Sequence, residues 1–193
     1  MNITLRGLLL SLLLVPAVWA APTTFKVDPA HSSVTFTVRH LVSQVEGRFR
    51  TFEGTIDYDQ ADPKNSKVDF TVQSDSIFTD NEKRDGHLKG ADFFDAAKYP
   101  TLEFHSKKVL VHGKELSVVG ELSMHGVKKP VTVTVTPLGV AKSPNGGTVA
   151  GFKAEFVVNR KDYGIIYNKT LDAGGTMLGD DVNVRVLVEA GKK

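Results

Sequence analysis

From Phe25 onward, apolar and polar residues alternate along most of the chain with a period of two. Val34–Val38 and Val182–Val188 are two clear examples, with Thr, Asp, Asn and Arg among the polar partners. Successive side chains of a β-strand point to opposite faces, so this alternation predicts strands with one buried and one solvated face. Turn residues such as His112-Gly113-Lys114 separate the runs and predict tight hairpins. The chain should therefore be all-β, with about eight antiparallel strands forming either a sandwich or a closed barrel.

One segment interrupts the alternation. The sequence from residue 80 to residue 90 is rich in charged residues and lacks the period of two. Asp80 or Asn81 suits the start of a short helix, and Gly90 suits its end. A turn with two consecutive phenylalanines follows, so we expect a lid or plug beside the strands rather than a separate domain.

The N-terminus has the layout of a secretory signal peptide over residues 1–20. Arg6 precedes an apolar run, Leu8–Val15, and small residues lead up to a cleavage site after Ala20. The run is shorter than the roughly 20 residues that a membrane-spanning helix needs. We therefore expect export to the periplasm, with residues 21–193 forming a single soluble domain without a stable membrane anchor.

Composition and spacing argue against several classes of function. The chain has no cysteine, which excludes thiolate nucleophiles and iron–sulfur clusters, and its net charge of +2 comes without the basic stripe of a nucleic-acid-binding protein. No nucleophile–base arrangement or phosphate-binding loop is visible, so we expect no enzyme activity and no cofactor. No two histidines are spaced as ligands on one strand face or one helix, so we expect no metal site. The six histidines are His31, His40, His87, His105, His112 and His125.

Five motifs, in order along the chain, carry a resemblance to a known family. They are Asp28–Phe36, Val45–Gly54, Arg84–Pro100 (with Arg-Asp-Gly-His-Leu and Asp-Phe-Phe-Asp), Gly120–Val131 and Asn159–Gly164. Together they resemble the YceI-like family of polyisoprenoid-binding periplasmic proteins, over about Thr24 to Ala190. One departure is mild: a serine, Ser123, follows Leu122 where the family usually has threonine. The resemblance implies a lipocalin-like antiparallel barrel with a helix at its side, which carries long amphiphilic chains in its lumen.

The strand faces that we take as inward, together with the two phenylalanines of the turn after the short helix, supply the candidate ligand-binding residues. Each could also be plain core, because buried apolar residues are the default. The candidates are Phe36, Val38, Phe52, Phe70, Phe93, Phe94, Leu102, Phe104, Leu122, Met124, Phe156 and Val158. A polar rim for the ligand head group would consist of Arg84, Asp85, His87 and Arg160. The alternative for these four residues is a structural ion pair and a cap that fix the helix to the barrel.

Two main functional hypotheses follow. The first is a periplasmic carrier that holds a polyisoprenoid or a similar amphiphile, such as a quinone-like compound, in the barrel. The second is a structural or stress-related interaction protein with a filled barrel and no ligand. An unrecognised lipid hydrolase or isomerase is a third, weaker alternative. The sequence leaves open whether the chain forms a homodimer.

Overall fold

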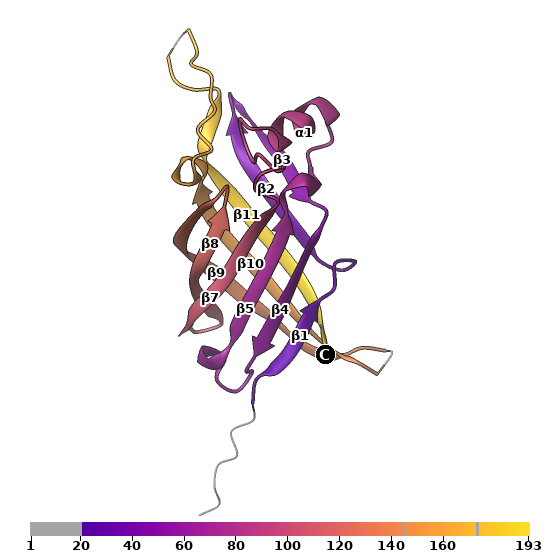
Figure 1. The fold of residues 1–193 in the computed structure, drawn as a ribbon. Coiled ribbons are helices and arrows are strands. Elements are labelled where there is room, and N and C mark those ends of the chain that lie inside the picture. The colour runs from indigo at the N-terminus through magenta and orange to yellow at the C-terminus, as the bar shows by residue number, and fades with distance from the viewer. Residues whose placement is uncertain (1–20, 145, 173) are drawn as a thin grey trace, which may run out of the picture.

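The computed structural model describes residues 21–144, 146–172 and 174–193, and its main body is a closed antiparallel β-barrel (Figure 1). The predicted signal peptide, residues 1–20, lies outside the described residues. The barrel closes through pairing between its first and last strands, with Phe25 opposite Lys192. Its eight strands are β1 (Thr23–Val27), β4 (Phe52–Tyr58), β5 (Lys67–Gln73), β7 (Thr101–His112), β8 (Glu115–Met124), β9 (Val127–Lys142), β10 (Thr148–Asn159) and β11 (Leu178–Lys192). The prediction of an all-β, lipocalin-like barrel of about eight strands is therefore confirmed.

Three further strands enlarge the sheet at one end of the barrel. They are β2 (Ser33–His40), β3 (Ser43–Phe49) and β6 (Ile77–Phe78). The last strand shares one edge between two neighbours: Ala190 of β11 pairs with Val27 of β1, whereas Val184 of β11 pairs with Phe36 of β2. β2, β3 and β6 therefore extend the wall at the end of the molecule opposite the C-terminus (Figure 1).

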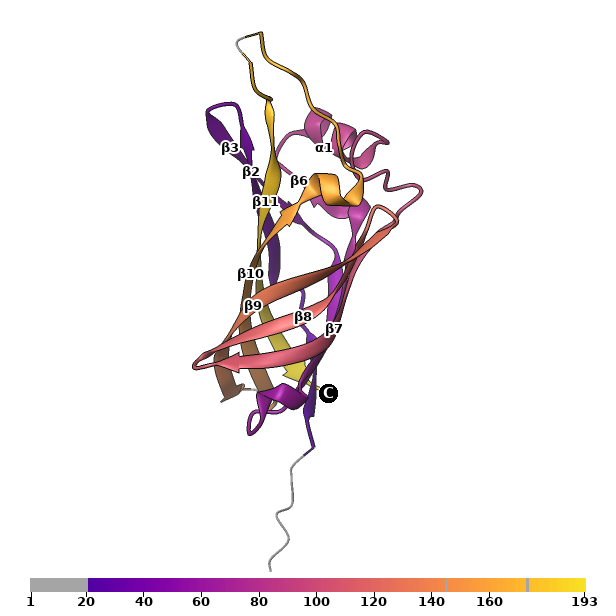
Figure 2. The same cartoon turned by 90° about the vertical axis from the view of Figure 1, so that its left-hand side faces the viewer.

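A short helix, α1 (Glu82–Lys89), lies at this same end (Figure 2). The side chain of Asn81 caps it by accepting a hydrogen bond from the backbone N–H of Arg84, and Gly90 ends it. The prediction of a helix near residues 80–90 is confirmed. No helix among the described residues has the length and hydrophobicity needed to cross a bilayer.

The end of the barrel near the C-terminus is filled with side chains. Phe25, Ile56 and Phe152 are buried there, and the ring of Tyr58 meets the ring of Phe152 edge-on at 5.1 Å. Phe52 belongs to the same core and stacks on Phe70 at 5.8 Å. Burial of apolar surface stabilises a fold by about 25 cal/mol per Å². This packed end is therefore expected to supply much of the stability of the barrel, which leaves the other half free to be hollow.

Candidate ligand cavity

The half of the barrel beside α1 encloses a cavity of about 660 Å³. Its wall is almost entirely hydrocarbon and comes from β2, β3, β5, β6, β7, β8, β10 and β11, with α1 and residues 165–169 at one end. Eleven of the twelve predicted ligand-binding residues line it: Phe36, Val38, Phe70, Phe93, Phe94, Leu102, Phe104, Leu122, Met124, Phe156 and Val158. Their contact with a ligand stays a prediction, but the structure brings them together around one hollow.

Phe52 is the exception, because it lies outside the cavity wall. Its ring is buried in the core cluster that contains Phe25 and Ile56, and it stacks against Phe70, which does line the cavity. The alternation correctly placed this side chain inside the barrel. The alternation carries no information on how far along the barrel axis a side chain lies, so it could not predict which inward side chains line the cavity.

Three phenylalanine rings in the cavity wall lie against glycines of neighbouring strands. A Cβ atom added at Gly47 would come within 2.3 Å of the ring of Phe36. Equivalent distances are 2.6 Å from Gly54 to the ring of Phe70 and 2.5 Å from Gly120 to the ring of Phe104. A glycine in a strand often marks such a close approach. The missing side chains let these rings lie flat on the sheet, which keeps the lumen open.

The polar end of the cavity is framed by residues of α1 and of the segment before β11. His87 of α1 lies between two rings, at 5.0 Å from Phe93 and 4.9 Å from Tyr167, edge-on to both. Its Nε2 is 2.8 Å from a carboxylate oxygen of Asp92. Lys169 completes the frame. We call this end, lined by Lys83, His87, Tyr167 and Lys169, the mouth.

Asp85, predicted for the polar rim, does not line the cavity. Its buried carboxylate accepts hydrogen bonds from the backbone N–H of Thr79 at 2.9 Å and from the Thr79 hydroxyl at 2.5 Å. Arg84 does line the cavity, but two of its guanidinium nitrogens donate to the oxygens of Thr79, at 2.7 and 2.6 Å. The pair therefore fixes the start of α1, as the structural alternative proposed, although through Thr79 rather than through an ion pair.

Arg160 is likewise a structural residue in this fold. It is 4% exposed, and its guanidinium donates to the backbone oxygens of Gly179, Ile165 and Tyr167 at 2.9, 2.7 and 2.8 Å. Asp180 accepts a further, longer bond at 3.2 Å. Burial lowers the pKa of Arg160, and Asp180 partly offsets that effect. Although Arg160 borders the cavity, its guanidinium donates its hydrogen bonds to backbone oxygens and so fixes the segment before β11.

The sequence analysis missed the lysines of the mouth. Lys83 and Lys169 both line the cavity, and neither makes an ion pair with another described residue. Nothing in the sequence sets these two lysines apart from the other lysines of the chain. They line the cavity only because α1 lies opposite the segment before β11. Their two ammonium groups give the mouth a positive character. Glu103 is also among the lining residues, but its carboxylate accepts a bond from the Thr101 hydroxyl and lies 3.8 Å from His105 on the same strand.

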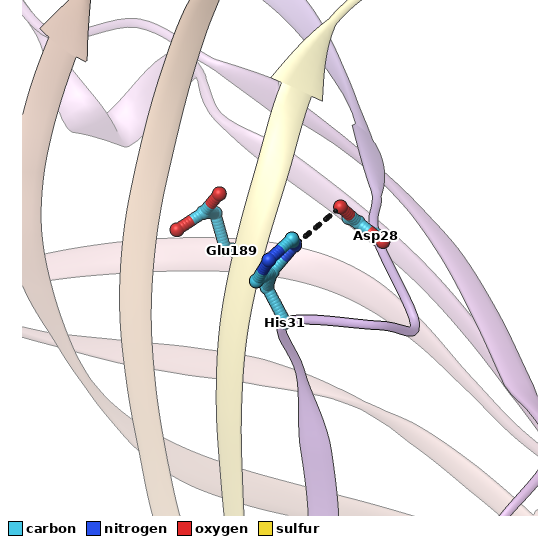
Figure 3. Close-up of side chains that lie close together, drawn as sticks. All are labelled: Asp28, His31 and Glu189. Atoms are coloured by element: carbon cyan, nitrogen blue, oxygen red, sulfur yellow. Dashed lines mark hydrogen bonds and ion pairs between the residues drawn. The ribbon is translucent and has the colours of Figure 1, made fainter. Parts of the chain in front are cut away.

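A second cluster lies at the other end of the molecule. Ligand atoms of Asp28, His31 and Glu189 come within 4.8 Å of one another (Figure 3). Carboxylate and imidazole groups at such spacing could hold a divalent cation. The spacing analysis of histidines alone could not find it, because Glu189 is distant in sequence. A hydrogen bond of 2.8 Å between His31 Nδ1 and Asp28 accounts for the same arrangement without an ion, and it raises the pKa of His31 and lowers the pKa of Asp28.

Comparison with known proteins identifies the family of this barrel. Residues 25–190 match the YceI-like domain. The chain belongs to the YceI-like family. Protein YceI of Escherichia coli O157:H7 is 38% identical over 168 residues, which cover 86% of this chain and 88% of that protein. The resemblance seen in the five sequence motifs is thus confirmed.

Solved structures support the fold of this YceI-like protein. BcnA of Burkholderia cenocepacia superimposes with a TM-score of 0.76 at 23% identity, over 85% of this chain and 99% of that one. A polyisoprenoid binding domain from Saccharophagus degradans, implicated in plant cell wall breakdown, gives a TM-score of 0.65 at 14% identity, over 89% and 99% of the two chains. At these identities the likeness concerns the fold alone.

Proposed function

We propose that this YceI-like protein binds a polyisoprenoid or a similar long-chain amphiphile in its cavity and carries it through the periplasm without catalysing a reaction. The observation that carries the proposal is the cavity of about 660 Å³ with an apolar wall and a single polar end. This volume falls within the range of small-molecule sites, about 300–1,000 Å³. The ligand class agrees with the polyisoprenoid binding domain of similar fold, and the periplasmic location agrees with the layout of residues 1–20.

The wall explains how such a ligand would be held without specific contacts. Each buried CH2 group contributes roughly 0.8 kcal/mol, so a long chain accumulates affinity along the hollow. Apolar contact discriminates weakly between chains of similar width, so a range of amphiphiles could share the site. The polar atoms of the mouth would meet the head group, which is the one part of the ligand that prefers water.

The alternative of a filled barrel is supported for one half only. Side chains fill the end near the C-terminus, whereas the end beside α1 is hollow. Organic extraction of the purified protein followed by mass spectrometry separates the two proposals. The carrier requires an amphiphile in near-stoichiometric amount. Repeated empty extracts, together with no uptake of added prenols, would refute it.

Charged substitutions in the wall give a second test. Phe104→Asp and Phe156→Asp place a carboxylate in the cavity, where loss of hydration costs several kcal/mol unless water enters. Because the cavity opens at the mouth, we expect water to enter once lipid is absent, so that both variants fold but retain no lipid. Circular dichroism and extraction on the same sample measure the two effects, and Val157→Asp, on the outer face at 58% exposure, is the matched control. A folded Phe104→Asp variant with lipid at the wild-type ratio would contradict the assignment of the wall.

A further inference from the structure

The tip of the hairpin between β2 and β3 has an apolar turn in a strained conformation. Leu41 and Val42 form the two-residue loop between His40 and Ser43, which pair with each other. Leu41 has a φ of 53°, in the left-handed region, where such loops favour glycine, asparagine or aspartate. The two side chains are also unburied, with Leu41 43% and Val42 102% exposed. Neither local conformation nor packing accounts for leucine and valine at this position.

Other hairpins of the barrel use the expected residues. The turn between β7 and β8 has Gly113 with a φ of 62°, and in the turn between β8 and β9 His125, with a φ of 52°, precedes Gly126, with a φ of 76°. Histidine is several-fold enriched at positive φ among non-glycine residues, whereas a bulky leucine is an outlier there. The same backbone requirement at the β2–β3 tip is met by Leu41 at the cost of strain. A glycine would adopt this backbone conformation without strain. The fold of the hairpin therefore does not require a leucine at position 41.

The strained turn is held rigidly. The backbone N–H of Leu41 donates to the carbonyl of Met177 at 2.8 Å. The guanidinium of Arg39 donates to the carbonyl of Leu41 and to the carbonyl of Thr176, each at 3.2 Å. Strained conformations persist when their surroundings over-determine them, and they cluster at functional sites. The tip is thus a fixed apolar projection, tied to the segment that leads into β11.

This projection stands beside the mouth of the cavity. His40 and Met177, which flank the tip and its brace, both line the cavity. Ile166, 68% exposed, precedes Tyr167 of the mouth. Figures 1 and 2 both show the β2–β3 hairpin, α1 and the segment before β11 gathered at the end of the molecule farthest from the C-terminus. The exposed apolar side chains therefore project at the end where the cavity opens.

We propose that this tip, Leu41 and Val42 together with Ile166, inserts into the surface of a lipid bilayer, so that the mouth opens onto the membrane. The inference rests on the proposed function, because an amphiphile that fits the cavity resides in membranes. A stable protein interface needs about 800 Å² from each partner. Three side chains on two separate loops offer far less than that, whereas a bilayer surface accepts isolated apolar projections. Lys83 and Lys169, at the mouth, would face the anionic head groups of the leaflet.

The test is flotation of the mature protein with vesicles of phosphatidylcholine and phosphatidylglycerol. The variant Leu41→Gly/Val42→Ser gives the turn the chemistry of the other hairpins. We expect it to bind vesicles at least about tenfold more weakly, since the inserted side chains carry most of the apolar contact. Its melting temperature should be unchanged or higher, because the strain at Leu41 is removed. The matched control is Leu138→Ser, which removes an apolar side chain of 61% exposure from β9 and should bind vesicles like the wild type.

Three results would overturn the proposal. Failure of the wild type to float with these vesicles would by itself refute membrane docking. Equal binding by Leu41→Gly/Val42→Ser and the wild type would also refute it. Dissociation of a dimer in that variant, seen by analytical ultracentrifugation, would assign the tip to a second copy of the chain instead. Lipid content after extraction is measured on every sample, so an empty cavity, which would contradict the proposed function, is distinguished from a failure of docking.

Discussion

Replacing Gly47 by alanine would test whether the glycines of the wall keep the lumen open. The new Cβ would lie 2.3 Å from the ring of Phe36 and 2.9 Å from a methyl group of Thr79. Thr79 is 3% exposed and bonded to the buried Asp85, so it has little freedom to move. The ring of Phe36 must therefore leave the wall and enter the cavity that it lines.

The size of the effect can be worked out from these distances. Carbon atoms in contact lie about 3.5–4.0 Å apart, so the ring has to retreat from the 2.3 Å position by at least about 1.2 Å. Overpacking of this kind costs about 1–3 kcal/mol. For a domain of this size, each kcal/mol lowers the melting temperature by about 2–4 °C. We expect a loss of about 2–12 °C on this basis, together with a lower ratio of bound lipid to protein and a shift toward shorter or thinner chains.

Calorimetry and extraction with mass spectrometry measure the two effects on the same preparation. Gly86→Ala in α1 is the matched control, because an added Cβ there meets no atom within 4 Å. It should leave the lipid ratio unchanged and slightly raise stability, since alanine favours a helix over glycine. If Gly47→Ala kept the wild-type lipid ratio and melting temperature, the reasoning about flat rings and glycines would be wrong.

Three further predictions address polar side chains. Arg160→Met should lower the free energy of unfolding, measured by urea denaturation, by about 1–3 kcal/mol for each of the three backbone carbonyls that lose their buried donor. Tyr163→Phe should leave the melting temperature unchanged or raise it; the buried hydroxyl makes no hydrogen bond to a described residue, and burial raises the pKa of Tyr163 to about 12. A clear loss of stability there would reveal a hidden partner. Asp28→Asn should lower the melting temperature most between about pH 4 and pH 6.5. As the pH falls, Asp28 takes up a proton at its lowered pKa, and the stabilisation by the pair is lost. As the pH rises, His31 releases its proton at its raised pKa, and the stabilisation is lost again. A difference in melting temperature that did not depend on pH would contradict this reasoning.

The pattern of residues was enough to predict the strands and most of their inner face, whereas closure into a barrel followed from the resemblance to the YceI-like family. Period-two alternation assigns a side chain to the inside or the outside, and it did so correctly for Phe36, Phe104 and Phe156. It says nothing about height along the axis, which is why Phe52 was expected in a cavity that lies elsewhere. Height depends on the stagger of strands around the closed sheet, and that is set by pairings between residues distant in sequence, such as Val27 with Ala190.

The polar residues were harder to interpret, because a charged side chain has the same appearance in sequence whether it meets a ligand or supports the fold. Asp85 and Arg160 are strongly polar and lie near the cavity, yet both are buried and bonded within the protein. Lys83 and Lys169 had no distinguishing signal, and the structure places them at the mouth. Burial and partners decide such cases, and neither can be deduced from the order of residues.

The division of the barrel into a packed half and a hollow half connects stability with the proposed function. Hollow space forfeits the contacts that a packed core would make, and strain at Leu41 adds a further cost at the same end. A fold is only marginally stable, so these costs must be offset elsewhere. The packed cluster around Phe25, Ile56 and Phe152 offsets part of that cost, and these three side chains lie outside the cavity wall. The buried hydrogen bonds of Arg160 and of Asp85 hold the segments around the cavity and contribute further. A barrel arranged in this way can exchange its ligand at one end while the strand pairing that closes it, between β1 and β11, stays intact at the other.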